Sequence, residues 1–358
     1  MSFSFNFDVR AQTVGSNDGG EDDPQTGKAD HANATAESAK QSELVKDAKE
    51  HFPPLDLRCL FVNAVPETVT IGSLPPLHFL NETVFEKTSS DREDGEKILA
   101  CTAEQRSDLI SGVYEGGLKV WECTYDLLEL VERDGETFGG KRVLDLGCGA
   151  GLLGILALKR GATQTHFQDY NSTVIEHLTL PNVLLNCQGD DLESEDDEEE
   201  DKGKAKRKKG GECKNKVRDE ERQEVMNDGP TAKKRAPDQT QHSSLNKCRF
   251  FSGDWTTFLA LVMKEDRPPK YDIIFTSETI YNTDYYPALH DTLHRLLAPD
   301  GLVYLATKSH YFGVGGGLYL FERFVEQRGV FSMQHLWDLD EGLQRHVMGL
   351  RFGNAKAP

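Results

Sequence analysis

Short runs of apolar residues alternate with segments in which apolar residues recur every three or four positions through the second half of the chain. The short runs are typical of buried strands, and the wider spacing is typical of amphipathic helices. The predicted strands are Lys141–Leu146, Thr165–Asp169, Cys248–Gly253, Tyr271–Ser277, Gly301–Thr307, Phe331–Trp337 and His346–Phe352. The predicted helices are Gly151–Arg160, Ser172–Leu178, Thr256–Lys264, Asp284–Leu297 and Leu318–Gln327, and helical spacing also runs from Ser107 to Val131.

This alternation predicts the fold class. Strands that alternate with helices form a mostly parallel sheet covered on both faces, because each crossover helix returns over the sheet. We therefore expect a doubly wound α/β fold with a seven-stranded, mostly parallel sheet. The last two strands are close enough along the chain to form an antiparallel pair.

The segments outside this pattern predict the domain organisation. Residues 1–50 are rich in Asp, Glu, Ser, Gln, Ala and Gly and are expected to be a disordered tail. Within it Phe3, Phe5 and Phe7 alternate like a strand that docks on the folded body, or they form a loose end. Residues 51–106 read as a wrapping extension with little regular structure. Residues 107–358 form the folded domain, interrupted by a low-complexity insertion at 188–246.

Charge is concentrated in that insertion. Ten acids occupy the twelve residues from Asp190 to Asp201, and six bases occupy the eight from Lys202 to Lys209. Like charges in blocks repel one another and stay solvated, so an inserted disordered loop is expected. The clusters Lys204–Lys209 and Lys233–Arg235 are either nuclear-import signals or solvated charge that balances the acidic run.

Composition narrows the class of function. The net charge is -19, the hydrophobic fraction is 37% and the mean hydropathy is -0.56. An acidic chain is a poor nucleic-acid binder, so we expect no dedicated nucleic-acid site and a basic partner, unless the charge only maintains solubility. Seven scattered cysteines without a CxxC motif indicate reduced thiols and no zinc site. No secretory signal and no membrane span are predicted.

The strongest chemical signal is the glycine-rich turn after the first strand of the sheet. The segment Asp145-Leu-Gly147-Cys-Gly149-Ala-Gly151 lies between a strand and a helix, where glycines let the backbone approach a ligand. A carboxylate two residues before the first glycine would repel a pyrophosphate, but it suits a cationic ligand such as S-adenosylmethionine. The alternative is that Asp145 is only a turn residue.

Two further acids end the next two strands. Asp169 is placed to accept hydrogen bonds from ribose hydroxyls, or it caps the following helix. Asp254 is placed to bind an adenine amino group, and Trp255 to cover the ring. Alternatively Asp254 caps the next helix, which is compatible with ligand binding, and Trp255 is a core residue.

These motifs carry a resemblance to a known family. The glycine motif and Ser277-Glu278-Thr279-Ile280-Tyr281 resemble the seven-β-strand S-adenosylmethionine methyltransferases and the acid-x-x-Tyr signature of their protein-methylating branch, from about Asp108 to Phe352. Longer runs are similar to the protein-histidine methyltransferases. They are GVYEGGLKVWECTYDLL, HFQDYN, TLPNV, CRFFSGDW, TSETIYN and KSHYFGVGGG.

The resemblance implies a cofactor site and a substrate. The implied cofactor-binding residues are Val120, Trp121, Glu122, Cys123, Thr124, Asp145, Gly147, Gly149, Gln168, Asp169, Tyr170, Gly253, Asp254, Trp255 and Ser277. The implied substrate is one histidine of large-subunit ribosomal protein L3, methylated on its τ nitrogen. The implied location is the cytoplasm and the nucleus, including the nucleolus, and a monomer is expected.

The chemistry of methyl transfer suggests catalytic candidates. A histidine acceptor is largely neutral at pH 7, since its pKa is about 6.5, and mainly needs one ring nitrogen to keep its proton. Glu278 is the first candidate acceptor for that proton, and Tyr281 and Asn282 would orient the ring. His310 is a candidate base or an ordinary hydrogen-bonded histidine. The glycines at 313–317 form a substrate-facing lip or a flexible turn. A lysine acceptor, or a non-catalytic binding module, stays open at this point.

Overall fold

The computed structural model describes residues 45–56, 60–61, 65–81, 109, 115–187, 244–340 and 342–353. The predicted docking strand at Phe3–Phe7, the basic clusters and nearly all of the insertion therefore lie outside the described residues. No helix within these ranges is long and apolar enough to cross a membrane.

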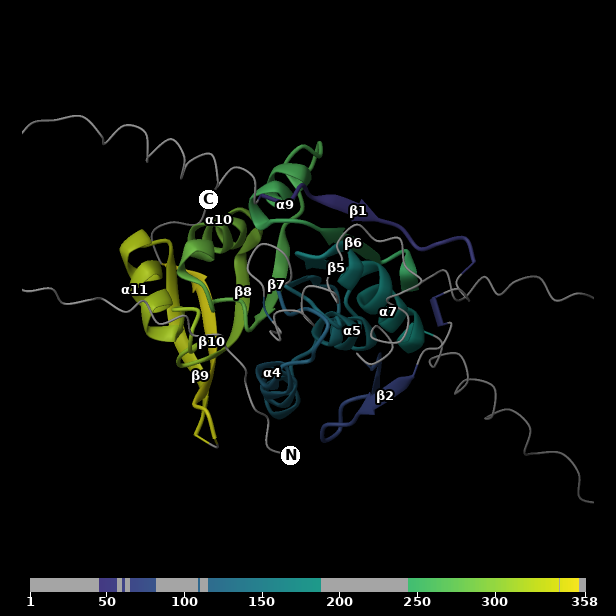
Figure 1. The fold of residues 1–358 in the computed structure, drawn as a ribbon, viewed down its shortest axis with the longest axis horizontal. Coiled ribbons are helices and arrows are strands. Elements are labelled where there is room, and N and C mark those ends of the chain that lie inside the picture. Colours follow the sequence, from purple (N-terminus) through teal and green to yellow (C-terminus); the bar gives the residue numbers. More distant parts are fainter. Residues whose placement is uncertain are drawn as a thin grey trace, which may run out of the picture.

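One large sheet forms the centre of the molecule (Figure 1). Its eight strands lie in the order β1-β6-β5-β4-β7-β8-β10-β9. They are β1 (Lys49–His51), β6 (Cys248–Ser252), β5 (Gln164–Asp169), β4 (Arg142–Leu146), β7 (Tyr271–Ser277), β8 (Leu297–Lys308), β10 (Arg345–Phe352) and β9 (Phe331–Leu339). The inner pairs from β6 to β8 are parallel, and β10 and β9 close one edge antiparallel.

Helices cover both faces of this sheet (Figure 1). One face packs against α4 (Glu122–Arg133), α5 (Leu152–Lys159) and α7 (Leu180–Cys187). The other packs against α9 (Trp255–Val262), α10 (Tyr286–Leu296) and α11 (Leu318–Arg328). Buried strand residues such as Leu144 and Ile274 have almost no exposed surface, as expected for a sheet covered on both sides. The doubly wound α/β prediction is confirmed, and all seven predicted strands are present.

The N-terminal side is more ordered than the sequence suggested. The predicted boundary at residue 50 falls inside β1, which adds an eighth, antiparallel strand beside β6. The extension contains a hairpin of β2 (Pro66–Val69) and β3 (Leu77–Leu80), so the expectation of little regular structure was wrong there. The hairpin is anchored by α7, where the Asn182 and Asn186 side chains accept hydrogen bonds from the Leu80 and His78 amides at 2.8 and 3.0 Å.

The helix after β5 is longer than predicted. It runs through α6 (Ser172–Val174), the π-helical turn η3 (Ile175–Thr179) and α7 (Leu180–Cys187), whereas the prediction ended at Leu178. Pro181 has no N–H for the helical ladder, which made the sequence look like a helix end. A π-helical turn just before the proline, where the hydrogen-bonding pattern shifts by one residue, lets the helix continue.

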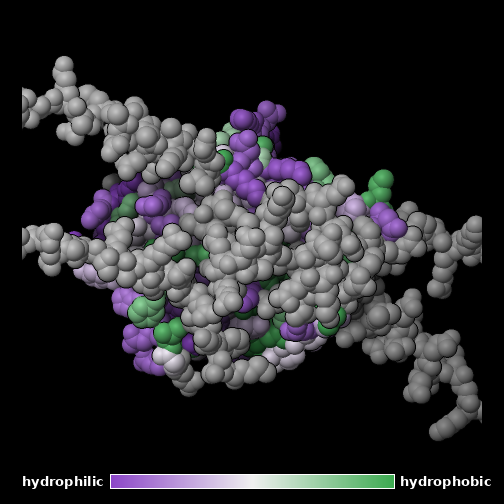
Figure 2. Space-filling view, viewed as in Figure 1, coloured by the Kyte–Doolittle hydropathy of each residue, from purple (hydrophilic) through white to green (hydrophobic). Residues whose placement is uncertain are grey.

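A 3₁₀ turn, η4 (Thr283–Tyr285), leads into α10. The described surface facing the viewer carries hydrophobic residues in small groups between hydrophilic ones (Figure 2).

Candidate functional site

A cavity of about 430 Å³ opens at the carboxyl ends of the parallel strands. The turns after β4, β5, β6 and β7 line it, together with the segment from Glu115 to Thr124. Ligands of doubly wound folds bind at this edge because the loops leaving neighbouring strands meet there. The predicted residues that line the cavity are Val120, Trp121, Thr124, Gly147, Gly149, Asp169, Tyr170, Gly253, Asp254, Trp255, Ser277, Glu278, Tyr281 and Asn282.

The glycine turn after β4 forms the floor of this cavity. Gly147, Gly149 and Gly151 have φ values of 70°, 50° and 76°, which side chains rarely tolerate. A Cβ on Gly147 would lie 2.7 Å from Thr279 Cγ2. The amides of Gly147 and Cys148 donate to the Gln168 carbonyl at 2.8 and 2.9 Å, which ties the turn to the end of β5. The glycines are therefore required by both conformation and space.

Asp169, at the end of β5, points its carboxylate into the cavity region. It accepts hydrogen bonds from the amides of Gly149 at 2.9 Å and Asn171 at 3.2 Å. Burial raises the pKa of Asp169 to about 6, against the effect of these hydrogen bonds, so the group is mostly ionised at neutral pH. The N-cap of α6 is Asn171, not Asp169, so the capping alternative does not apply, and the Asp169 side chain lines the cavity.

Asp145 lies elsewhere than predicted. It is buried, does not line the cavity, and accepts a hydrogen bond from the Gly154 amide at 2.9 Å. Burial raises its pKa to about 7, opposed by the Gly154 hydrogen bond, and the charge of Asp169 adds to the rise. The expectation that its carboxylate faces a cationic ligand is therefore wrong for this structure. Asp145 holds the glycine turn against α5.

The two residues that follow β6 have structural partners and also line the cavity. Asp254 caps α9 by accepting from the Thr256 amide at 2.7 Å, and it also lines the cavity. Trp255 packs against the core of one face and donates from its indole to Gln168 Oε1 at 2.9 Å. Gln168 itself is buried behind the cavity and donates to the Gly253 carbonyl at 2.8 Å. Gln168 therefore holds Gly253 and Trp255 in place but does not itself line the cavity.

The segment before α4 is only partly a wall of the cavity. Thr124 donates from its hydroxyl to Ser277 Oγ at 3.1 Å, which joins α4 to the end of β7. Cys123 is fully buried and Glu122 pairs with Lys308 at 3.1 Å, and neither lines the cavity. Helical geometry turns these two side chains away from Thr124, so this structure does not bring them to the cavity with the other predicted residues.

Glu278 combines backbone strain with a buried ion pair. Its φ of 59° is the only positive value at a non-glycine among the described residues. Such a conformation costs on the order of 1–3 kcal/mol and is typical of functional sites. Its Oε1 lies 3.3 Å from the Lys308 ammonium, which also contacts Glu122. Burial opposes the charge of Lys308, but the two carboxylates raise its pKa, so it stays a cation.

The sequence reasoning missed Glu115. Its carboxylate accepts hydrogen bonds from the hydroxyls of Tyr281 and of Tyr285, the latter at 3.0 Å. All three side chains line the cavity, and the two rings meet edge to face with centroids 6.0 Å apart. Burial and the Glu115 charge raise the pKa of Tyr281 well above its ordinary value, so it stays a hydrogen-bond donor. The only available signal was its place in the run from Gly112 to Leu128.

Asn282 and His310 differ in their relation to the site. Asn282 lines the cavity and caps η4 by accepting from the Asp284 amide at 3.0 Å. His310 is exposed and does not line the cavity, so this structure does not place it with the other candidates. The glycine run packs on the chain itself: the Gly316 amide donates to the Tyr281 carbonyl at 2.8 Å, and a Cβ there would lie 2.3 Å from the Ile280 oxygen. The glycine run at 313–317 therefore packs against the backbone of Tyr281.

Comparison with known proteins shows which family this chain resembles. A family model described as a methyltransferase domain matches residues 122–341. "Histidine protein methyltransferase 1 homolog" from Bos taurus is 44% identical over 90% of this chain and 78% of its own length. The protein of that name from Mus musculus is 44% identical over 88% and 77%. A solved "putative sam-dependent methyltransferase from Streptococcus mutans" is 12% identical over 79% of this chain and 55% of its own, with a TM-score of 0.42. The chain therefore belongs to the histidine protein methyltransferase 1 family.

Proposed function

We propose that this protein transfers the methyl group of S-adenosylmethionine to the τ nitrogen of one histidine in large-subunit ribosomal protein L3. The observation that carries the proposal is the cavity at the carboxyl edge of the sheet, with Asp169, the glycine turn and the Glu115–Tyr281 pair on its walls, in a chain of this family. The negative charge of the whole chain favours a basic protein as substrate.

The residues on the cavity wall fit the cofactor. Its volume of about 430 Å³ lies within the usual range for small-molecule sites. The ionised Asp169 carboxylate would accept from the ribose hydroxyls, and Asp254 and Trp255 would bind the adenine. The glycine turn leaves room for the methionine portion. When bound, S-adenosylmethionine supplies a methyl group on a positively charged sulfur.

The chain's part in the reaction is alignment and control of one proton. The substrate imidazole must be neutral, with a lone pair on the attacking nitrogen and a proton on the other. A bond forms between that nitrogen and the methyl carbon while the carbon–sulfur bond breaks, and the sulfur keeps the electron pair. Glu278 or Glu115 would accept the remaining ring N–H and stabilise the positive charge that develops on the imidazole.

The two acids would act differently. Glu115 lines the cavity in front of Tyr281 and Tyr285, whereas one oxygen of Glu278 is buried against Lys308. Glu115 is thus better placed to contact a substrate ring, and Glu278 to fix the geometry of the loop that carries Tyr281 and Asn282. Burial of Tyr281, and its edge-to-face contact with the half-buried Tyr285, would keep the two rings in place for orienting the imidazole.

A lysine acceptor is the second candidate, favoured by the same acidic residues. Glu115 and Asp169 would draw an ammonium group into the cavity, yet they would also raise its pKa and keep it protonated. Neutral lysine is required for attack, and its ordinary pKa is about 10.4. The same acids would raise the pKa of an imidazole, but from about 6.5, so at neutral pH a far larger neutral fraction is available for attack than with lysine.

The test uses the purified full chain with methyl-labelled cofactor and isolated large-subunit ribosomal proteins. Mass spectrometry should place the label on one histidine of L3, and replacing that histidine should abolish labelling. Methyl-lysine without methylhistidine would refute the proposal. Calorimetry that detects no S-adenosylmethionine binding would instead support a non-catalytic module.

We also propose that the protein acts as a monomer in the cytoplasm and in the nucleus, including the nucleolus, where ribosomal proteins assemble. Support comes from the basic clusters Lys204–Lys209 and Lys233–Arg235. A fluorescent fusion should lose nuclear signal when both clusters are replaced by alanine. An unchanged distribution would show that the clusters are only solvated charge.

A further inference from the structure

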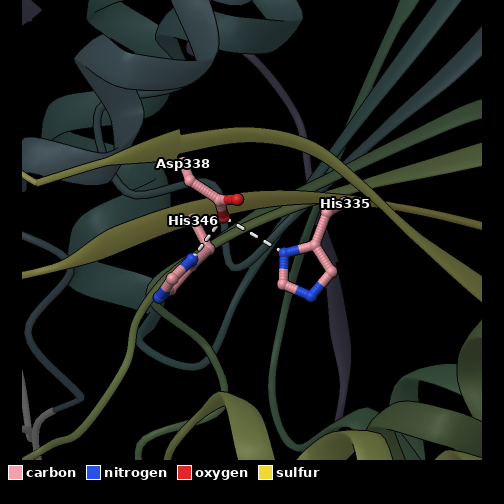
Figure 3. Close-up of side chains that lie close together, drawn as sticks. All are labelled: His335, Asp338 and His346. Carbon is pink, nitrogen blue, oxygen red and sulfur yellow. Dashed lines mark hydrogen bonds and ion pairs between the residues drawn. The ribbon is translucent and has the colours of Figure 1, made fainter.

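Two histidines and an aspartate converge on the β9–β10 hairpin, outside the cofactor cavity (Figure 3). His335 Nδ1 lies 3.1 Å from Asp338 Oδ1, and His346 Nδ1 lies 2.6 Å from the same oxygen. One atom from each residue lies within 4.8 Å of the other two. In Figure 3 both rings turn their Nδ1 atoms toward the carboxylate between them.

A β-bulge brings the three side chains to one face. Side chains alternate along a strand, so residues 335 and 338 of a regular strand would point to opposite faces. Here His346 pairs with Asp338, Val347 with Trp337, and Met348 with His335, which leaves residue 336 without a pairing partner. The extra residue turns His335 to the same side as Asp338. Bulges commonly re-aim side chains at functional sites.

The other nitrogen of each ring already has a partner. His335 Nε2 lies 3.2 Å from Glu322 Oε1 on α11, and His346 Nε2 lies 2.6 Å from Ser309 Oγ after β8. Histidines that bind metals usually donate their second N–H to such a partner, which fixes ring orientation and tautomer. Both Nδ1 atoms would then be free of hydrogen and carry a lone pair toward the centre of the cluster.

The protons that His335 must carry distinguish this cluster from an ordinary ion pair. Without a cation at the centre, His335 lies between the Asp338 and Glu322 carboxylates and must carry protons on both nitrogens to donate to each. Its side chain and that of Asp338 are about half exposed, at 49% and 53%. An exposed pair of this kind contributes little stability, so the bulge and the two outer partners need a different explanation.

We propose that His335, Asp338 and His346 form a binding site for a divalent transition metal, with zinc the best match. Two imidazole nitrogens and one carboxylate oxygen are ligands that Zn²⁺ prefers, and water would complete the tetrahedron. Ligand atoms in a tetrahedral zinc site are about 3.3 Å apart, given bonds of about 2.0 Å. The present His–Asp separations of 3.1 and 2.6 Å are shorter than this, and all three ligand atoms lie within 4.8 Å of one another, so the side chains would move to admit the ion.

A metal at this site would link the β9–β10 hairpin, α11 and the segment after β8. Both strands of the hairpin supply ligands, α11 supplies Glu322, and the segment after β8 supplies Ser309. Ser309 also donates its amide to the Gln344 carbonyl and accepts from the Leu318 amide. A metal here would therefore hold Ser309, which precedes the glycine run that packs against Tyr281.

The test is binding of Co²⁺ and Zn²⁺ to the metal-stripped full chain. Co²⁺ should give the visible absorption of a tetrahedral nitrogen–oxygen site at one equivalent, and Zn²⁺ should displace it. His335→Ala and Asp338→Asn should each weaken binding at least 100-fold, whereas Ser309→Ala should weaken it by about 10-fold as an outer partner does. His310→Ala, an exposed histidine on the neighbouring loop, is the matched control and should bind normally.

Circular dichroism of each variant without metal separates lost binding from lost folding. His335 is half exposed, so His335→Asn provides a second variant that keeps polarity and should fold. Substoichiometric binding, or binding that both His335 variants leave unchanged, would overturn the proposal. A cobalt–thiolate charge-transfer band would overturn it as well, because it would assign the metal to cysteine.

Discussion

Replacing Asp169 with asparagine should raise the free energy of unfolding of the cofactor-free protein and should also weaken cofactor binding. The carboxylate is buried, and its pKa rises from its ordinary 3.8 to about 6. The folded protein therefore holds this proton more tightly than the unfolded chain does. The contribution of Asp169 to the free energy of unfolding is greatest below about pH 4, falls as pH rises through about 6, and is constant above.

The magnitude follows from that change of about two pKa units. At 1.36 kcal/mol per unit, keeping the carboxylate ionised at pH 8 costs about 3 kcal/mol, which Asp169→Asn would recover at most. The asparagine oxygen can still accept from the Gly149 amide, now 2.9 Å from Asp169. The ribose would lose a charged acceptor, and such a hydrogen bond contributes about 1.5–3 kcal/mol, a Kd about 10- to 150-fold weaker.

Two measurements test this pair of opposite effects. Urea unfolding of the cofactor-free protein at pH 5 and pH 8 gives the stability, and calorimetry with S-adenosylmethionine at pH 8 gives the affinity. The gain in stability at pH 5 should be about half of the gain at pH 8, because pH 5 lies between the unfolded and folded pKa values of Asp169. Asp266→Asn, on the exposed surface, is the matched control and should change neither. A variant that is destabilised equally at both pH values, or that binds cofactor normally, would refute the assignment of Asp169.

Three further predictions address the loop, the turn and the insertion. Glu278→Gln should slow methyl transfer by about 10- to 100-fold and leave cofactor affinity unchanged, because Lys308 keeps Glu122 as a partner; an unchanged rate, matched by the exposed Glu326→Gln control, would remove Glu278 from the mechanism. Gly147→Ala should weaken cofactor binding at least 10-fold, since its φ is 70° and a Cβ would lie 2.7 Å from Thr279; calorimetry showing normal affinity would contradict the tight turn. Deleting residues 190–241 should leave activity on a substrate peptide intact, and loss of folding by circular dichroism would contradict the reading of an inserted loop.

Local chemistry made most of the fold and the cofactor side predictable. β7 has the predicted bounds, Tyr271–Ser277, because a run of apolar residues between turn residues is a property of the segment itself. The glycine turn and Asp169 were found for the same reason, since their spacing relative to a strand end decides where they lie. Here the sequence alone determined which edge of the sheet holds the cavity.

Contacts between segments that are distant along the chain could not be predicted from the sequence. Lys308 lies between Glu122 and Glu278, and Glu122 is 186 residues away from it along the chain. Glu115 accepts a hydrogen bond from Tyr281, which is 166 residues away. Asp145 followed the expected spacing yet turned to the Gly154 amide, because a buried carboxylate takes the nearest donor that satisfies it.

The same limit applies to the elements that close the sheet. β1 reads as part of a polar tail, and it forms a strand only because the edge of β6 offers unpaired backbone groups. The bulge in β9, which gathers His335, Asp338 and His346, exists only in register with β10. The sequence by itself determined the α/β layout and the cofactor edge, since these follow from local periodicity and turn chemistry. The tertiary structure decided which charged groups meet, because burial and pairing depend on segments that only folding brings together.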